Sequence, residues 1–332
     1  MEVGGYALSW FASFLTGRTE QVKVGDSLSQ IFDVKSGVVQ GSVCGPGLFS
    51  ILADSLLRRI KSHSWAFADD IKFVADVTSN SRDVVQEDVN TVLQWSEEMH
   101  MPLSLDKSVV MHCGRNQPNF IYTLKGSPMP CVESFKDLGV VRSHNGHITE
   151  QCCAVYSKAS RLAGAIRHIF QQRSPQLMWP AFQSYILPIL MYCSQAWNPV
   201  LVYDSNLIEK VQRRYTKSIA GLRQLSYGDR LKSLSALSLR NRRLYADLVF
   251  AYKAVHGLFN CQASDFGLHM VTSSTRGSGT RLAQRRVKSR IFSGLYCVRA
   301  PSQWNKLPLD ITNCRTLATF KKRIFKYLVS LQ

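Results

Sequence analysis

Apolar positions follow two alternating periods along the first part of the chain. A helical spacing covers residues 6–15, and the short apolar stretches 21–24 and 31–34 predict two strands joined through Gly25-Asp26. The helical spacing returns from Leu48 to Ile60, just after Pro46. Proline suits the first turn of a helix because its missing N–H has no partner there in any case.

The alternation continues to about residue 145. Residues 65–77 predict two strands around Asp69-Asp70, and residues 83–99 predict an amphipathic helix. Residues 120–141 predict further strands with turns at Gly126 and Gly139. The first part of the chain therefore mixes short strands with helices.

From Thr149 onward the spacing of apolar residues is helical. Asp204 is expected to cap one of these helices, and Ser226 with Asp229 resembles a capping box for another. The other predicted helices lie around residues 155–169, after Ser174-Pro175, over 244–257 and over 316–331. Residues 271–290, rich in Ser, Thr, Gly and Arg, predict an exposed, mobile connector. The pattern predicts an α+β chain, and its 332 residues allow about two domains.

Charge separates the two halves of the chain. Residues 1–150 hold 13 Lys and Arg against 17 Asp and Glu, a balance of −4. Residues 151–332 hold 28 against 6, a balance of +22, which brings the whole chain to its +18. We therefore expect an anionic partner such as nucleic acid, with an anionic membrane surface as the competing interpretation.

The cysteines and the N-terminal residues indicate an intracellular protein. Nine cysteines, an odd number without a Cys-x-x-Cys pair, argue against a disulfide framework and a zinc knuckle. No basic segment precedes an apolar block in residues 1–19, so no signal peptide is expected.

Two motifs carry the candidate chemistry. One is a glycine-rich turn that enters the helix predicted at Pro46, with the sequence Ser36-Gly37-Val38-Val39-Gln40-Gly41-Ser42-Val43-Cys44-Gly45-Pro46. The other, Phe67-Ala68-Asp69-Asp70, places two carboxylates at a turn between strands. Such carboxylates can hold Mg²⁺, whereas an Asp-Asp pair alone can also be an ordinary solvated turn. The glycine motif upstream favours the metal site.

Together the motifs resemble those of reverse transcriptases, in the form found in non-LTR (LINE-type, jockey-like) retrotransposons. The glycine motif departs from the family pattern at Val39, Cys44 and Gly47. The resemblance implies an incomplete palm, a small antiparallel sheet with helices, over residues 1–145. It further implies a mostly helical thumb or connection over 146–265, then a basic connector and a C-terminal helical segment over 266–332.

The resemblance also implies roles for single residues. Asp69 would ligate Mg²⁺ or Mn²⁺ and Asp70 would support it, while Lys107 would be a general acid toward the leaving pyrophosphate unless it is a plain surface lysine. Leu138-Gly139 resembles the hairpin turn that grips the primer. The residues expected at the nucleotide and template are Gln40, Gly41, Ser42, Gly45, Phe67 and Ala68.

The basic half also resembles segments downstream of the polymerase in jockey-like proteins. A helical i, i+3, i+4, i+7 spacing predicts one basic face toward the nucleic-acid backbone, or else a merely solvated face. Its residues are Lys210, Arg213, Arg214 and Lys217, and Arg285 and Arg286 are expected to add further contacts. Trp304 could stack on a base or belong to the core.

One family motif has no counterpart in these 332 residues. In the family an earlier strand supplies another essential Asp, and neither Asp26 nor Asp33 lies in a similar sequence. We therefore expect a C-terminal part of a reverse transcriptase that is inactive alone, or alternatively a non-catalytic nucleic-acid-binding relic. The expected partners are an RNA template, a DNA primer and, in an active protein, deoxynucleoside triphosphates, but no membrane. The implied location is the nucleus and cytoplasm, within a ribonucleoprotein.

Overall fold

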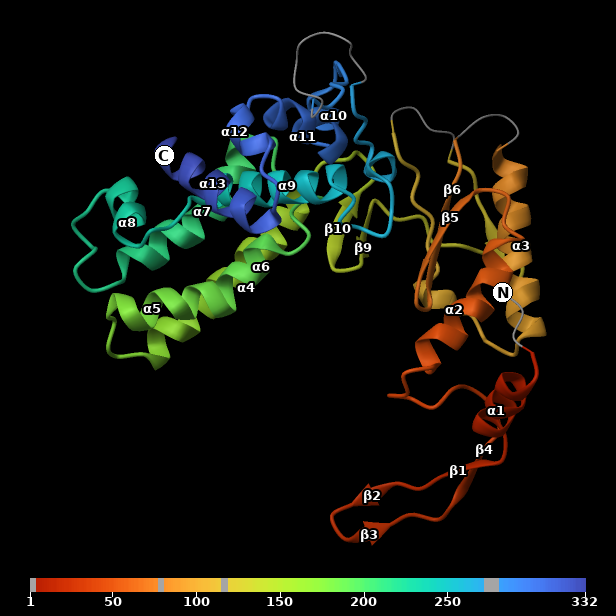
Figure 1. Ribbon diagram of the computed structural model, residues 1–332. Coiled ribbons are helices and arrows are strands. Elements are labelled where there is room, and N and C mark those ends of the chain that lie inside the picture. Colours follow the sequence, from red (N-terminus) through yellow and green to blue (C-terminus); the bar gives the residue numbers. More distant parts are fainter. Residues whose placement is uncertain (1–3, 77–80, 115–118, 272–280) are drawn as a thin grey trace. The chain divides into compact units, whose positions relative to one another are not determined.

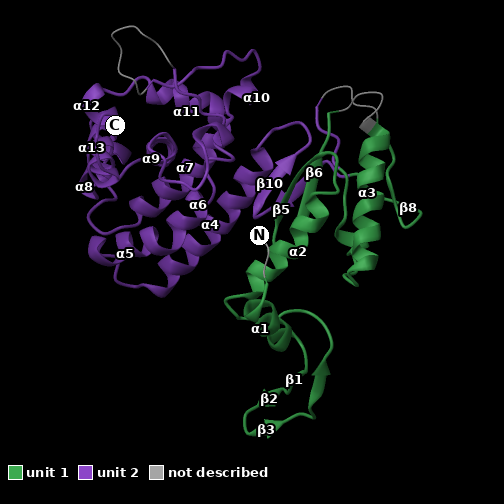
Figure 2. Ribbon diagram, turned by 45° about the vertical axis from the view of Figure 1, so that its right-hand side comes forward, with its two compact units in different colours: residues 1–110, 116–131 green, residues 111–115, 132–332 purple. Residues whose placement is uncertain are grey.

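The computed structural model describes residues 4–76, 81–114, 119–271 and 281–332 (Figure 1). The chain forms two compact units (Figure 2). Unit 1 consists of Met1–Val110 and Asn116–Cys131, and unit 2 of Met111–Arg115 and Val132–Gln332. Helices mix with small antiparallel sheets, as the pattern of apolar residues predicts. The predicted boundaries near residues 145 and 265 stay predictions.

Unit 1 combines helices with two-stranded hairpins. Its helices in the described residues are α1 (Tyr6–Leu15), α2 (Gly45–Leu57), α3 (Ser81–Glu98) and the 3-10 turn η1 (Leu105–Lys107). Its strands are β1 (Arg18–Glu20), β2 (Lys23–Val24), β3 (Ser27–Leu28), β4 (Phe32–Val34), β5 (His63–Phe67), β6 (Asp70–Val74), β7 (Thr123–Leu124) and β8 (Ser127–Pro128). The antiparallel pairs are β1 with β4, β2 with β3, β5 with β6, and β7 with β8.

The strand pairing near the N-terminus differs from the prediction. We expected residues 21–24 to be joined to 31–34 through Gly25, but the turn at Gly25 leads into β3 instead. Strand β4 pairs with β1, in the register Thr19 opposite Asp33. The glycine, with φ near +60°, permits a tight turn that returns the chain at once.

A small core joins α2 to α3. Leu56 and Trp95 are buried, and the Trp95 indole Nε1 donates a hydrogen bond of 2.9 Å to Ser55 Oγ. Helix α2 also packs against β5. The predicted helix over residues 83–99 is confirmed, and it packs against α2 and β7.

Unit 2 is mainly helical and begins with the hairpin β9 (Ser134–Asp137) and β10 (Val140–Ser143). Its longer helices in the described residues are α4 (Thr149–Ile169), α7 (Val202–Lys217), α9 (Leu239–Val255), α11 (Tyr296–Trp304) and α13 (Leu317–Ser330). Its shorter segments are α5 (Pro175–Ala181), the π-helical η2 (Phe182–Ile186), α6 (Leu187–Met191), α8 (Tyr227–Ser233), the 3-10 helix η3 (Ala263–Phe266), α10 (Arg290–Ser293) and α12 (Leu309–Thr312).

Two apolar clusters hold unit 2 together. One lies among α4, α5, η2 and α7, and the other among α9, α11, α12 and α13. Trp304 is 1% exposed in the second cluster, so it belongs to the core and is not available for base stacking. Among the described residues no helix is long and apolar enough to cross a membrane, and all nine cysteines are free thiols.

Most predicted helix starts are confirmed. Ser174 precedes α5, and the Ser226 hydroxyl accepts a hydrogen bond from the Asp229 amide at the start of α8. The prediction for Asp204 is wrong, because α7 begins at Val202 and Asp204 lies inside its first turn. There the Asp204 carboxylate is buried and accepts a hydrogen bond from Thr149 Oγ.

The predicted connector over residues 271–290 is covered only in part, because residues 272–280 lie outside the described residues. The Val271 amide donates a 2.9 Å hydrogen bond to the Arg281 carbonyl, and Leu282 is 1% exposed. The expected exposure is therefore wrong at Leu282, which packs in the second cluster.

Removing the Phe182 ring should destabilise unit 2. The ring is fully buried and lies between Trp179 and Tyr215, with centroids 5.1 and 5.0 Å away. We expect Phe182→Ala to lower the free energy of unfolding by about 3–5 kcal/mol, measured by urea titration. Tyr185→Ala in the same segment removes an exposed ring and should change it by less than about 0.5 kcal/mol. Equal losses in the two variants would contradict the packing described.

Candidate active site and nucleic-acid interface

The glycine motif forms a tight turn into α2. The Gly45 amide donates a 3.0 Å hydrogen bond to Ser42 Oγ, and Gly41 adopts φ near +82°, which favours glycine. A Cβ at Gly45 would lie 2.9 Å from Ser42 Oγ and 3.3 Å from the Val39 carbonyl oxygen, so a larger residue there would force the Ser42 hydroxyl to move. Gln40 and Gly41 remain exposed beside it.

Arg18 supports the start of this motif, a role that the sequence analysis missed. Its guanidinium Nη2 donates a 2.6 Å hydrogen bond to the Gly37 carbonyl, and its Nε donates a 2.9 Å bond to the Leu15 carbonyl. Arg18 thereby ties the end of α1 to the glycine motif. No local pattern indicates this contact, because its partners are backbone carbonyls.

The β5–β6 hairpin presents the two carboxylates. Phe67 pairs with Asp70 as the last pair of the ladder, and Ala68 and Asp69 form the turn. Ala68 adopts φ near +51°, an uncommon conformation for a residue with a Cβ. Phe67, Asp69 and Asp70 are all exposed, so the hairpin tip is accessible to a ligand.

A buried carboxylate from α3 fixes the chain where it enters this hairpin. Asp88 is 1% exposed and accepts hydrogen bonds from the amides of Lys61 and Ser62, at 2.8 and 3.0 Å. The signal for this residue was a carboxylate at helical spacing from the apolar Val85 and Val92. We missed it because such a residue is usually solvated.

Asp69 and Asp70 offer oxygen ligands of the type that Mg²⁺ takes, and Mg²⁺ retains several of its waters when few protein ligands are present. The donor set therefore fits a divalent cation. Within the described part of the chain, no group of three or more His, Cys, Asp or Glu side chains gathers at one place. Lys107 is exposed at the end of η1, and no described hydrogen bond or ion pair joins it to either carboxylate.

The hairpin predicted to grip a primer has a well-supported turn. Leu138 and Gly139 adopt φ near +45° and +84°, and Tyr192 Oη donates a 3.0 Å hydrogen bond to the Leu138 carbonyl. A Cβ at Gly139 would lie 3.2 Å from the Tyr192 ring. Arg142 also donates a 3.0 Å hydrogen bond to the Ala196 carbonyl, which anchors the hairpin within unit 2.

Helix α7 has a buried polar side and an exposed basic side. On the buried side, Glu209 accepts hydrogen bonds from Tyr227 Oη and from the amides of Leu239 and Arg240. Burial, with the neighbouring Glu209 carboxylate, raises the pKa of Tyr227. The exposed side carries the four predicted cations Lys210, Arg213, Arg214 and Lys217.

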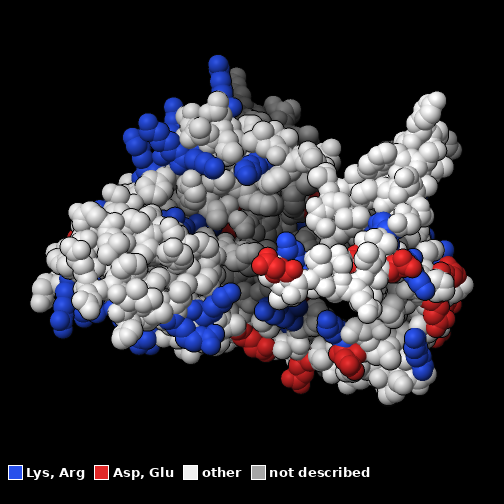
Figure 3. Space-filling view, turned by 90° about the horizontal axis from the view of Figure 1, so that it is seen from below, with Lys and Arg blue, Asp and Glu red and all other residues white. Residues whose placement is uncertain are grey.

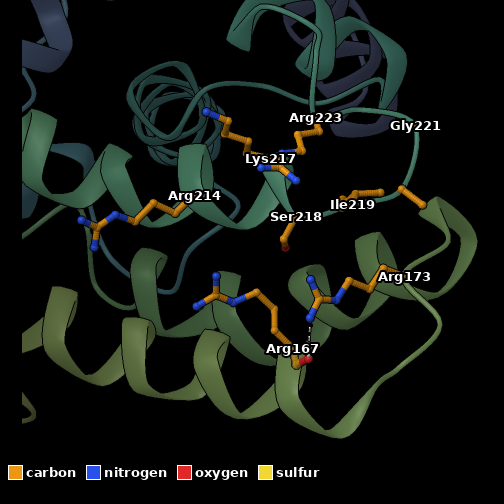
Figure 4. A pocket seen from close by; sticks show the side chains of 9 residues that line it. Arg167, Arg173, Arg214, Lys217, Ser218, Ile219, Gly221 and Arg223 are labelled. Atoms are coloured by element: carbon orange, nitrogen blue, oxygen red, sulfur yellow. Dashed lines mark hydrogen bonds between the residues drawn. The ribbon is translucent and has the colours of Figure 1, made fainter.

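The surroundings of these four cations differ. The Arg213 guanidinium lies 4.9 Å from the centre of the Tyr227 ring. Arg214 and Lys217 instead line an open hollow of about 770 Å³, together with Arg167, Arg173 and Arg223 (Figure 4). The sequence pattern did not indicate the last three, because they come from segments outside α7.

The remaining predicted cations lie in another part of unit 2. Arg285 and Arg286 are exposed, and Arg285 Nη2 is 3.2 Å from His269 Nε2. Neither residue lines the hollow. On the face seen in Figure 3, Lys and Arg are spread over the helical unit, whereas most Asp and Glu lie over unit 1. This distribution agrees with the charge balance of the two halves.

Comparisons with known proteins agree with the motifs. Residues 2–142 match the family model described as reverse transcriptase (RNA-dependent DNA polymerase). A protein from the type-1 retrotransposable element R1DM of Drosophila melanogaster is 24% identical over 250 residues, 72% of this chain and 22% of the relative. The RNA-directed DNA polymerase from the mobile element jockey of the same fly is 25% identical over 228 residues, 63% of this chain.

A further relative is a Pol polyprotein from the type-1 retrotransposable element R1 of Bradysia coprophila. It is 24% identical over 197 residues, which are 54% of this chain and 19% of the relative. The jockey polymerase is covered over 24% of its length. The chain therefore spans about a fifth to a quarter of the curated relatives that it matches.

Removing the Glu209 carboxylate should destabilise the contact of α7 with α9. Glu209→Ala leaves two backbone amides and the Tyr227 hydroxyl without their acceptor. Because an unpaired buried donor costs about 1–3 kcal/mol, we expect a loss of at least about 2 kcal/mol in urea unfolding. Amide hydrogen exchange at Leu239 and Arg240 should also become faster.

The matched control is Glu150→Ala, which removes an exposed carboxylate from the first turn of α4. Only a favourable interaction with the helix dipole is lost there, so the change should stay below about 1 kcal/mol. Unchanged exchange at Leu239 in Glu209→Ala would show that the carboxylate does not support α9.

Proposed function

We propose that this chain belongs to the reverse transcriptase family and serves RNA-directed DNA synthesis, because residues 2–142 match the family model and its relatives come from non-LTR retrotransposons. The observation that carries the proposal is the β5–β6 hairpin with Asp69 at its exposed tip. The glycine turn, α2 and this hairpin follow one another within the residues that match the family model. The activity of the whole protein is part of the proposal, since the chain spans only a fraction of its relatives.

In this proposal Asp69 holds a divalent cation, Mg²⁺ or Mn²⁺, and Asp70 supports it. When bound, the cation would activate the primer 3′-hydroxyl and neutralise charge on the incoming triphosphate. The bare backbone at Gly41 lets a nucleotide approach closely, and the exposed Gln40 amide can form hydrogen bonds with it. Lys107 would donate a proton to the pyrophosphate that leaves.

A second candidate is nucleic-acid binding without catalysis, favoured by the charge of the second half. Residues 151–332 carry a balance of +22, and no segment of the 332 residues resembles the first catalytic-Asp motif. Both functions use RNA and DNA as partners. They differ in one requirement: DNA synthesis needs the Asp69 carboxylate, whereas nucleic-acid binding does not.

We predict that the 332-residue polypeptide extends a DNA primer on an RNA template weakly or not at all. One carboxylate at the hairpin tip, with Asp70 behind it, should hold the metal ions poorly. The measurement is primer extension with deoxynucleoside triphosphates and Mg²⁺ or Mn²⁺. Any extension observed should fall at least about a hundredfold in Asp69→Asn. Extension that persists in this variant would contradict the catalytic assignment.

Metal binding tests the same site independently of activity. Mn²⁺ titration, followed by electron paramagnetic resonance, should show weak binding that Asp69→Asn removes. Asp76→Asn is the control, because Asp76 is an exposed carboxylate after β6 and outside the hairpin turn. Equal Mn²⁺ binding by wild type and both variants would argue against a metal site at Asp69. Nucleic-acid binding without catalysis would then be the remaining candidate function.

A further inference from the structure

Four segments of unit 2 meet around one basic hollow. Arg167 comes from the last turn of α4 and Arg173 from the segment that follows it. Arg214 and Lys217 come from the end of α7, and Arg223 from the loop after α7. In Figure 4, Arg167 and Arg173 lie on one wall, opposite Lys217 and Arg223. Arg173 Nη2 donates a 3.4 Å hydrogen bond to the Arg167 carbonyl, and the Lys217 side chain extends away from these two arginines.

Backbone and core contacts hold the two walls of the hollow in place. The Ala220 amide donates a 2.8 Å hydrogen bond to the Arg173 carbonyl, directly joining the two loops. Tyr215 Oη donates a 2.8 Å bond to the Met178 carbonyl, so α7 is fixed to α5, and burial raises the pKa of Tyr215 to about 12. Ile219, next to Ala220, is buried in the core. The hollow is therefore built on ordered packing.

The charges of the hollow are not balanced within the protein. As far as the described residues go, its lining contains five cationic side chains and no acidic one. In the described part of the chain, none of these five forms an ion pair with a carboxylate. Arg214 instead donates to Tyr156 Oη at 3.0 Å, and Arg167 to the Ala163 carbonyl at 3.2 Å. Like charges that converge without a counter-charge favour an anionic ligand.

Helix dipoles explain only part of this cluster. Arg167, Arg214 and Lys217 lie in the last turns of α4 and α7, where cations are favourable. Arg173 and Arg223 lie outside both helices, so the dipoles give no reason for their convergence on the same hollow.

We propose that this hollow binds the sugar–phosphate backbone of a nucleic-acid duplex, an inference that rests on the proposed function for its class of ligand. The hollow is open and larger than a single phosphate needs, and five cations exceed the charge of one phosphate. Among the described residues no aromatic side chain lines it, whereas sites for single strands commonly stack bases on aromatic rings. Binding should therefore be independent of base sequence.

The inference divides the exposed cations of α7 into two groups. Arg214 and Lys217 belong to the hollow, while Lys210 and Arg213 do not. The site is completed by Arg167 and Arg173, which are distant in sequence from α7, and by Arg223, which lies beyond the end of this helix. The affinity for a duplex then depends on where the cationic side chains lie as well as on the total charge of the protein.

The test compares two triple variants of the full chain that lose the same charge. The hollow variant is Arg173→Gln, Lys217→Gln and Arg223→Gln, three exposed side chains that form no described ion pair. The control is Lys321→Gln, Lys322→Gln and Lys326→Gln, three exposed lysines of α13. Binding of a short DNA duplex is measured by fluorescence anisotropy at several salt concentrations, with thermal melting as the check of folding.

Each phosphate contact contributes about 0.9 to the slope of log affinity against log salt. The hollow variant should therefore show a slope shallower by about 2 to 3, equally for duplexes of unrelated sequence. The control variant should keep nearly the wild-type slope. Equal changes in the two variants would overturn the proposal, because net charge alone would then explain binding.

Preferential binding of a different ligand would also overturn the proposal of a duplex site. If inorganic phosphate displaces the duplex more strongly than chloride of the same ionic strength, the hollow is a site for one phosphate group. Preferential binding of a single strand, or of phosphatidylserine vesicles, would likewise exclude a duplex site. None of these outcomes depends on Asp69, so primer extension and Mn²⁺ binding test the proposed function separately.

Discussion

The helical unit depends on the way α7 pairs the polar groups on its buried side. Glu209 accepts hydrogen bonds from the first amides of α9 and from Tyr227 in α8, and Gln212 donates to the Leu237 carbonyl at 2.9 Å. The first amides of a helix have no partner within that helix, so an acceptor from elsewhere is needed when they are buried. One side chain of α7 thereby supplies the acceptor for the first amides of α9 and holds the Tyr227 side chain of α8.

This pairing also decides which residues α7 presents to solvent. A rotation of the helix about its axis would leave buried donors unpaired at about 1–3 kcal/mol each, so the register of α7 is well defined. Arg214 and Lys217 then face the same hollow as Arg173, whose carbonyl binds the Ala220 amide. The position of the cations follows from the polar core beneath them, which supports α7 as a rigid platform for a polyanion.

Local features were predictable from the sequence, and long-range partners were not. Pro46 at a helix start, the turn at Gly139 and the strands around Asp69 follow from the preferences of neighbouring residues. Asp204 was wrongly assigned as a cap, because its partner Thr149 is distant in sequence. Arg167, Arg173 and Arg223 could be counted in the charge of the second half, but their convergence depends on tertiary packing.

The same distinction applies to the candidate metal site. A two-stranded hairpin is only marginally stable by itself, so the position of Asp69 depends on what holds β5 and β6. Asp88 pairs the two amides that precede β5, and α2 packs against that strand. Because Asp88 is buried and Asp69 is exposed, the first carboxylate acts on the structure while the second remains free to meet a ligand. The open end of the hairpin is thus anchored by a carboxylate that itself takes no part in the proposed chemistry.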